Sequence, residues 1–161
     1  MFKSRYQILL LVCLSMATSE VFAMGLFDFV KVCLFSGVNG VVTLEGKPVA
    51  GAELVRTAQI GETVHTDRTK TDDNGRFQFP AMYTHSVYKI APVEPFITQK
   101  IKILTGGHEY LAWSGNKRNY DLNGEIYQPL EFNCEIANKD EVLELGKSKS
   151  ISIYHGICRL K

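Results

Sequence analysis

From Gly40 onward the sequence consists of short strand-like runs separated by turn sequences, and this pattern most limits what the chain can fold into. The clearest turn is 72–75, Asp-Asp-Asn-Gly. Because Asn-Gly tolerates the positive φ angles of a tight primed turn, this sequence predicts a β-hairpin. A Gly-Lys-Pro turn occurs at 45–48, and Gly-Gly at 105–107 and Asn-Gly at 123–124 predict two further hairpins. Short strands at such spacing predict an all-β fold, a single antiparallel β-sandwich.

The expected strands are runs of β-branched, aromatic and aliphatic residues between these turns. They cover residues 41–44, 52–56, 62–71, 87–91, 96–104, 108–114, 129–136 and 150–159. Residues 139–145 are the exception, because the acidic side chains near their start favour a helical turn.

The N-terminus has the order of a secretory signal peptide. Lys3 and Arg5 precede an apolar run at 8–14, and Ala23 ends a small-residue cleavage site. We therefore expect residues 1–23 to be a signal peptide and the mature protein to be periplasmic or secreted. Two alternatives stay open: an uncleaved signal anchor, and a cytosolic protein translated from Met24.

The charge of the chain bears on its partners. The formal net charge is +1, and the leader contains two positive charges and one negative, so the mature chain has a net charge of 0. Nucleic acid and anionic membranes require clustered Lys and Arg, so neutrality argues against a nucleic-acid partner. The full chain has 161 residues, so after removal of the leader it is still long enough for one domain with a hydrophobic core.

Three cysteines remain after the leader is removed. Cys134 and Cys158 each lie in a strand-like apolar segment near the C-terminus, so we expect them to form a disulfide in an oxidising compartment. Cys33 lies between Val32 and Leu34, and we expect it to be a buried apolar residue.

Residues 24–37 form an apolar segment before the first turn, and 24–35 are almost wholly apolar. One interpretation packs this segment into the core of the sandwich. The other makes it a docking segment for a membrane or a partner. The core is favoured, because exposed apolar patches of this size are uncommon on soluble monomers. Membrane association is expected only through residues 24–35 or an uncleaved leader.

Two stretches resemble one known group of modules. Residues 40–52, GVVTLEGKPVAGA, are similar to the opening G-x-V-x-x-x-G-x-P-x-x-G-A of carboxypeptidase-regulatory-like and Cna-B-like domains. Residues 71–79, TDDNGRFQF, resemble their T-D-x-x-G-x-F-x-F hairpin. The resemblance covers residues 38–92 and implies a prealbumin-like (transthyretin-like) sandwich over 38–161. Residues 93–161 form its Cys-bearing C-terminal half.

What this resemblance implies is binding rather than catalysis, since such modules are usually accessory domains. The second half resembles small exported bacterial proteins that combine a first half of this kind with a Cys-bearing tail. Some of these look like immunity proteins, which protect a bacterium from toxins delivered by itself or its siblings. Fold by itself does not give function, so function must be inferred from individual residues.

Motifs of catalysis are missing from the sequence. The four histidines are scattered and lack the spacing of zinc ligands. The acidic turn at 72–74 lacks the alternating spacing of a calcium loop. No Gly-x-Ser-x-Gly elbow occurs. We therefore expect no enzyme activity, no metal and no cofactor.

Residues of the types that dominate protein interfaces are concentrated between 110 and 127. The candidate binding residues are Tyr110, Trp113, Lys117, Arg118, Tyr120 and Tyr127. The alternative is that Trp113 belongs to the core and the tyrosines cover its rim. The sequence thus predicts an exported binding module with a protein partner, such as a periplasmic immunity protein antagonising a secreted toxin. A glycan-binding or cell-surface structural module is the second hypothesis, because the same aromatic rings could stack on sugars.

Overall fold

The structure is a computed structural model that describes residues 30–145 and 152–161. The predicted signal peptide and residues 24–29 lie outside the described residues. The strands are β1 (Lys31–Phe35), β2 (Val38–Leu44), β3 (Lys47–Pro48), β4 (Glu53–Ile60), β5 (Thr63–Lys70), β6 (Arg76–Phe79), β7 (Met82–His85), β8 (Ile97–Thr105), β9 (His108–Lys117), β10 (Leu130–Glu135), β11 (Glu141–Leu145), β12 (Ser152–Gly156) and β13 (Cys158–Leu160). A single turn of 3-10 helix, η1, covers Val87–Ile90.

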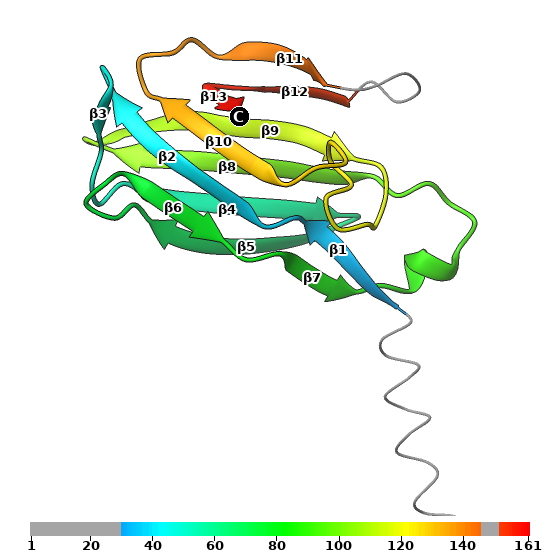
Figure 1. Cartoon of the computed structure of the whole chain (residues 1–161). Coiled ribbons are helices and arrows are strands. Elements are labelled where there is room, and N and C mark those ends of the chain that lie inside the picture. Colours follow the sequence, from blue (N-terminus) through cyan, green and yellow to red (C-terminus); the bar gives the residue numbers. More distant parts are fainter. Residues whose placement is uncertain (1–29, 146–151) are drawn as a thin grey trace, which may run out of the picture.

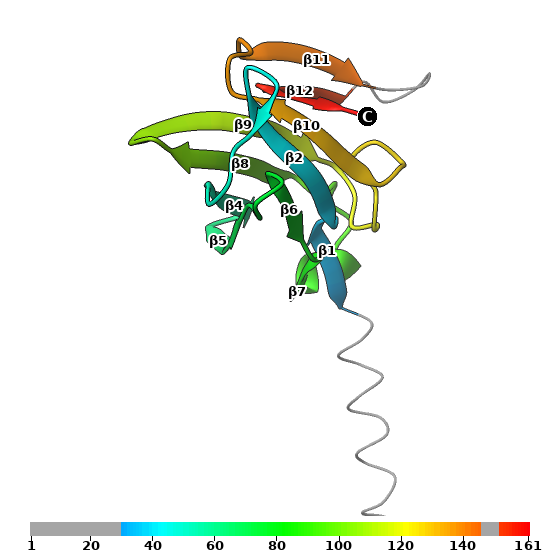
Figure 2. The same ribbon diagram turned by 60° about the vertical axis from the view of Figure 1, so that its left-hand side comes forward.

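The strands form the predicted β-sandwich. The first sheet has the order β11-β12-β9-β8-β4-β5, and the second has the order β13-β10-β2-β3, with β6 also paired to β2. β1 and β7 form a separate two-stranded sheet. Figures 1 and 2 show the second sheet lying over the first. The pairs are antiparallel except β2 with β10, which is parallel. Because β2 pairs with β10 and β4 with β8, the two halves of the chain share both sheets.

The core lies between the sheets and takes alternate residues of each strand. In β8 the inward positions are 97, 99, 101 and 103, and the outward positions are only half-buried. Trp113 stacks on Tyr154 with ring centroids 4.1 Å apart, and Phe132 lies 4.9 Å from the same indole. Gly115 lets the Tyr154 ring approach the backbone of β9, since a Cβ there would lie 2.0 Å from the ring. Packed aromatic rings therefore fill the centre of the core.

The apolar N-terminal segment is part of this core. Residues 32–35 of β1 are each at most 2% exposed, and β1 pairs with β7. Cys33 is a free, buried cysteine, as predicted. The docking interpretation is therefore wrong for residues 32–35, which cannot reach a membrane or a partner. No helix in the described ranges is long and apolar enough to span a membrane.

The hairpin predicted at 72–75 is wrong in its details. The segment is a turn, but β5 and β6 belong to different sheets, so it connects the two layers. Only Gly75 among these residues has positive φ, at 72°, which excludes a primed turn. Instead, Asp72 Oδ1 accepts hydrogen bonds from the backbone N–H groups of Asn74 and Arg76. The Asp72 side chain therefore caps a turn that crosses between the two sheets.

Of the two other predicted hairpins, one is present and one is absent. Gly106 and Gly107 have φ of 58° and 76° and form the β8–β9 hairpin, as predicted. Residues 123–124 form a turn, but β9 and β10 lie in different sheets, so they do not close a hairpin. Of the strand expected at 150–159, residues 150–151 lie outside the described residues. The remainder divides at Gly156, where φ is 147°, because β12 and β13 also lie in different sheets.

Two secondary-structure predictions were wrong. The strand expected at 87–91 is absent: η1 covers Val87–Ile90, and Pro92 and Pro95 follow it. Proline donates no backbone hydrogen bond to a sheet. Residues 141–145 form β11 rather than a helical turn, because pairing with β12 satisfies their backbone. In both cases tertiary context overrides local propensity.

The predicted disulfide is confirmed: Cys134 of β10 is bonded to Cys158 of β13, with 24 residues of sequence separation. The bridge fixes the edge of the second sheet. Replacing both cysteines by serine should lower the free energy of unfolding by about 3 kcal/mol, because the unfolded chain regains the freedom of the closed loop. Urea denaturation measures this, and an unchanged midpoint would contradict it. Cys33→Ser is a comparison that leaves the bridge intact.

Glu135 holds the β2–β3 turn. Its carboxylate accepts hydrogen bonds from the backbone N–H groups of Glu45, Gly46 and Ala137 and from the Thr43 hydroxyl. Partial removal from water raises the pKa of Glu135, but these hydrogen bonds outweigh it and lower the pKa below its ordinary value of 4.5. The group therefore stabilises the fold above pH 4.5, and this stability is lost as the pH falls through the lowered pKa.

Glu135→Gln should consequently reduce stability at neutral pH and flatten its decline below pH 4.5. Urea unfolding at a series of pH values measures both changes. If the free energy of unfolding of wild type and variant fell equally steeply with pH below 4.5, the Glu135 carboxylate would not contribute to stability. Glu131→Gln, an exposed carboxylate on β10 with no side-chain hydrogen bond to the described residues, is the matched control.

Candidate functional site

Five polar residues lie buried at one end of the sandwich: Ser36, Arg56, Gln99, Lys117 and Glu125, here called the buried polar cluster. Ser36 follows β1, where the chain bends into β2. Gln99 and Arg56 take inward positions on β8 and β4, and Lys117 ends β9. Glu125 belongs to the 118–129 loop, which connects β9 to β10. The cluster thus joins this loop to both sheets.

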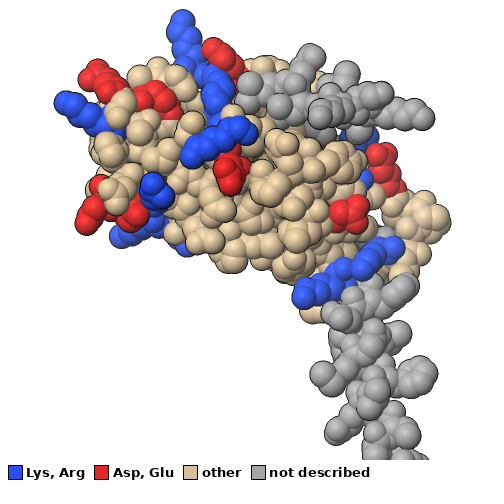
Figure 3. Space-filling view, in the orientation of Figure 1, with Lys and Arg blue, Asp and Glu red and all other residues tan. Residues whose placement is uncertain are grey.

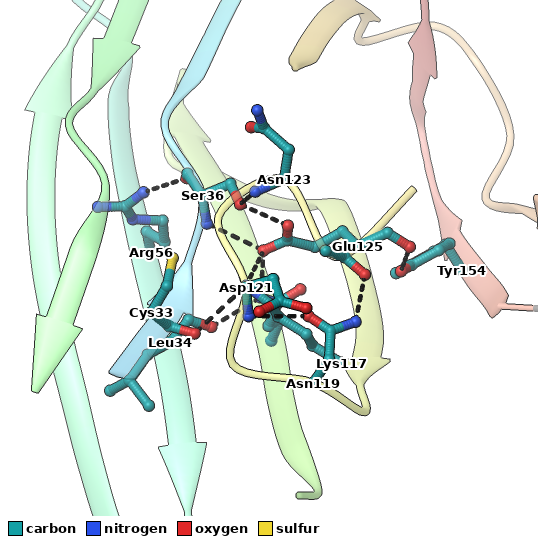
Figure 4. Close-up of polar contacts among 12 residues, drawn as sticks. Cys33, Leu34, Ser36, Arg56, Lys117, Asn119, Asp121, Asn123, Glu125 and Tyr154 are labelled. Carbon is teal, nitrogen blue, oxygen red and sulfur yellow. Dashed lines mark hydrogen bonds and ion pairs between the residues drawn. The ribbon is translucent and has the colours of Figure 1, made fainter. Parts of the chain in front are cut away.

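Glu125 is at the centre of the cluster, and Figure 4 shows its carboxylate directed toward Ser36 and Lys117. One oxygen, Oε1, lies 2.9 Å from the Ser36 backbone N, 2.8 Å from Gln99 Nε2 and 3.4 Å from Lys117 Nζ. The other, Oε2, accepts a hydrogen bond of 2.5 Å from the Ser36 hydroxyl. Both side chains of the Lys117–Glu125 ion pair are 0% exposed. A buried charge of this kind requires its partners, because losing one leaves the other unpaired away from water.

A second ion pair continues the cluster on β4. Arg56 makes a bidentate contact with Asp67 on β5, at 3.0 and 2.6 Å, and its guanidinium also donates to the backbone oxygens of Ser36 and Pro80. The guanidinium lies over the ring of Phe79, 4.6 Å from the centroid. This fixes the bend between β1 and β2.

Cys33 lies beside the cluster. Burial raises the pKa of its thiol, and the nearby Lys117 ammonium opposes this only in part. The thiol is therefore protonated at neutral pH and is a poor nucleophile. The Cys33 carbonyl accepts a hydrogen bond of 3.2 Å from Lys117 Nζ, which ties β9 to β1.

The 118–129 loop is held by further contacts on all sides. The Ser36 hydroxyl accepts from the Asn123 backbone N–H, the Tyr154 hydroxyl donates to the Glu125 backbone oxygen, and the Asn119 amide donates to Gly124. Loops held this firmly on a rigid scaffold often carry binding residues. The arrangement fixes the loop, whereas a substrate cannot reach the buried carboxylate and ammonium groups.

The structure separates the predicted binding residues. Arg118 and Tyr127 are exposed in the 118–129 loop, and Tyr127 is 77% exposed with φ of 60°. Tyr120 and Tyr110 are half-buried and pack against the core. Trp113 and Lys117 are fully buried, so their prediction as surface contacts is wrong. The alternative interpretation of Trp113 as a core residue matches the structure, and Lys117 faces inward to pair with Glu125.

Several exposed apolar side chains beside this loop were missed by sequence reasoning. They lie on the 86–96 segment, which contains η1, and on the 118–129 loop; both are at the same end of the sandwich in Figures 1 and 2. We call them the apolar end: Val87, Ile90, Val93, Phe96, Leu122 and Tyr127, each more than half exposed. Strand alternation could have indicated one of them. Phe96 directly precedes β8 and falls in register with its outward, polar positions, so its side chain is expected to be exposed.

Arg118 connects the two parts of the apolar end. Its guanidinium lies 5.9 Å from the centroid of Phe96 and 3.5 Å from Glu94, both at the end of the 86–96 segment. Each contact is solvent-exposed and individually weak. Together they place the segment beside the start of the 118–129 loop.

Fold and site define a small, disulfide-bridged β-sandwich in which a buried ion pair supports exposed apolar loops. Residues 38–139, more than half of the chain, match a family model described as a domain of unknown function (DUF6795), and the chain belongs to this family. The match includes Arg56, Gln99, Lys117 and Glu125, and it ends before Cys158. No curated protein and no solved structure matches the chain.

Proposed function

We propose that this protein is an exported, non-enzymatic binding module that acts through protein–protein interaction. The main support for this proposal is the apolar end, where six large apolar side chains are exposed on two loops. Large apolar side chains exposed at one end of a soluble domain favour an interaction site there. Aromatic residues and arginine, here Phe96, Tyr127 and Arg118, are the types that contribute most to interface energy.

The buried polar cluster supports this proposal by preorganising one of the two loops. A loop that is fixed before binding loses little conformational entropy when a partner docks. The buried Glu125 side chain anchors the loop to the core, while Leu122 and Tyr127 of the same loop are exposed to solvent. We propose a supporting rather than a catalytic role for the cluster, because its charged groups are closed to solvent.

Binding can be tested by comparing two variants as immobilised bait for periplasmic extract. Phe96→Ser with Tyr127→Ser removes two large side chains from the apolar end without touching the core. Val64→Ser, on the edge strand β5, removes an exposed apolar residue elsewhere and is the control. We expect a specific protein to be retained by wild type and by Val64→Ser but lost with the double variant. Equal retention by all three would contradict the proposed surface.

Export is supported by the signal-peptide pattern at residues 1–23 and by the disulfide, since disulfides persist in oxidising compartments. Intact mass spectrometry of periplasmic extract, with and without reduction and alkylation, tests this part of the proposal. We expect a chain that begins at Met24, with one disulfide and one free thiol. A leader-bearing chain in the membrane fraction, or a reduced chain in the cytosol, would contradict export.

Within this class we propose the role of a periplasmic immunity protein that antagonises a secreted toxin. A small, neutral, disulfide-bridged domain with a fixed binding surface suits such a task, and the family resemblance described above points the same way. Cells lacking the protein should be outcompeted by their parent strain in contact, and the double variant Phe96→Ser, Tyr127→Ser should fail to restore survival. Equal survival of deletion and parent strains would contradict the immunity role.

The second candidate, a glycan-binding or cell-surface structural module, was based on stacking of sugars on the aromatic run between 110 and 127. Trp113 is buried and Tyr110 and Tyr120 pack against the core, so this run offers no shared aromatic platform. A glycan would have to bind at a different surface.

A further inference from the structure

A groove of about 820 Å³ crosses the outer face of the second sheet, away from the apolar end. Its walls come from β2, β3, β6, β10, the end of β5, the 72–75 turn and Lys161, and Figure 3 shows this face as a broad neutral area with a few charged side chains. The exposed polar residues that line it include Asn39, Lys70, Asp72, Arg76, Gln78 and Glu131. We call this the polar groove.

Arg76 distinguishes the polar groove from the rest of the surface. The other arginines of the described residues each pair with a carboxylate: Arg56 with Asp67, Arg68 with Glu53, Arg118 with Glu94 and Arg159 with Glu141. Arg76 has no carboxylate of the described residues within ion-pair distance, although it is exposed at the start of β6. A free guanidinium is suited to bind a carboxylate through two parallel hydrogen bonds.

The amides next to Arg76 are also free. Asn39 and Gln78 are directly opposite each other on β2 and β6, and their side chains make no hydrogen bond within the described residues. An amide both donates and accepts, which matches the hydroxyl groups of a sugar. With Lys70, Arg76 and Lys161 against Asp72 and Glu131, the lining charge of the groove is +1.

The backbone at the start of β6 disfavours a peptide ligand. Peptides that bind along a sheet usually pair with the free edge of a strand. At the start of β6 that edge is occupied, since the Arg76 N–H donates to Asp72 Oδ1 and the Arg76 carbonyl accepts from the Asp72 N–H. The remaining contacts are side-chain amides and charges over a floor that includes Val41 and Pro48.

We propose that the polar groove binds an acidic oligosaccharide. The Arg76 guanidinium contacts a sugar carboxylate, and the amides of Asn39 and Gln78 contact neighbouring hydroxyl groups. This site is separate from the apolar end, so it adds a second ligand to the proposed protein partner and does not depend on it.

Isothermal titration calorimetry of the mature protein with tetragalacturonate tests this site. We expect wild type to bind, and Arg76→Gln to weaken binding by about tenfold or more, because a charge-assisted hydrogen bond is lost. Arg68→Gln, an exposed arginine on β5 that is already paired with Glu53, is the matched control and should bind like wild type. Asn39→Ala with Gln78→Ala should weaken binding with an unchanged urea midpoint.

Two further probes decide the ligand class. Maltotetraose has the hydroxyl groups without the carboxylates, and tetraglutamate has the carboxylates without the sugar; both should bind at least about tenfold more weakly than tetragalacturonate. The proposal is overturned by no binding of tetragalacturonate to wild type, by equal losses in the two arginine variants, or by equal affinity for either comparison probe. None of these outcomes bears on the apolar end.

Discussion

Replacing Glu125 by alanine is expected to lower the free energy of unfolding by about 3–5 kcal/mol, because it leaves the Lys117 ammonium buried and unpaired. The Ser36 N–H and the Gln99 amide lose an acceptor in the same step. Since small domains are stable by only about 5–15 kcal/mol, much of the total stability is at stake. Urea denaturation measures the loss. Amide hydrogen exchange should also accelerate in the 118–129 loop, where Asn123 and Gly124 depend on the anchored geometry.

The matched control is Glu131→Ala, which removes an exposed carboxylate from β10 and should change stability by less than about 0.5 kcal/mol. A double-mutant cycle with Lys117→Met and Glu125→Gln isolates the ion pair. We expect the double variant to be more stable than the sum of the single losses predicts, because neither charge is then left alone. Additive losses would mean that Lys117 and Glu125 do not interact across the core.

The second large effect is expected for Trp113→Ala, which should cost about 3–5 kcal/mol. The indole is 0% exposed and stacks between Tyr154 and Phe132, so its removal opens a cavity between the sheets. Thermal or urea unfolding measures the effect. If Trp113 were instead a surface contact, the variant would keep its stability and lose only binding.

Tyr127→Ala provides the opposite case, because this ring is 77% exposed and lies at the apolar end. Its loss should change stability by less than about 0.5 kcal/mol while weakening partner binding. The two aromatic residues were predicted together from one stretch of sequence, and the structure assigns them opposite roles. A large loss of stability in Tyr127→Ala would contradict this separation.

Much of the sandwich could be predicted from local signals. Hairpin turns such as 105–107 have glycines whose conformation determines the connection, and alternation of apolar residues marks the strands. The sequence of a turn does not determine whether the two strands that flank it pair with each other. The 72–75 and 123–124 turns therefore predicted hairpins, although each connects strands of different sheets. The helical turn expected at 139–145 was wrong for a related reason, because β11 depends on its pairing with β12.

The buried polar cluster was only partly accessible from sequence. Strand alternation places Gln99 between the inward Ile97 and Ile101, and Arg56 between Leu54 and Ala58, so two buried polar positions could have been recognised. Glu125 carried no such signal, since it lies in a loop with no periodicity. Its partner Ser36 is 89 residues away, and a contact of that separation depends on the whole fold.

Crosslinking in living cells tests most directly whether the apolar end binds a protein partner. A photoreactive amino acid in place of Tyr127, compared with the same substitution at Val64 on β5, reports what contacts each surface. We expect one discrete crosslinked protein from position 127, absent from position 64 and lost when Glu125→Ala loosens the loop. No product from position 127, or the same products from both positions, would contradict it.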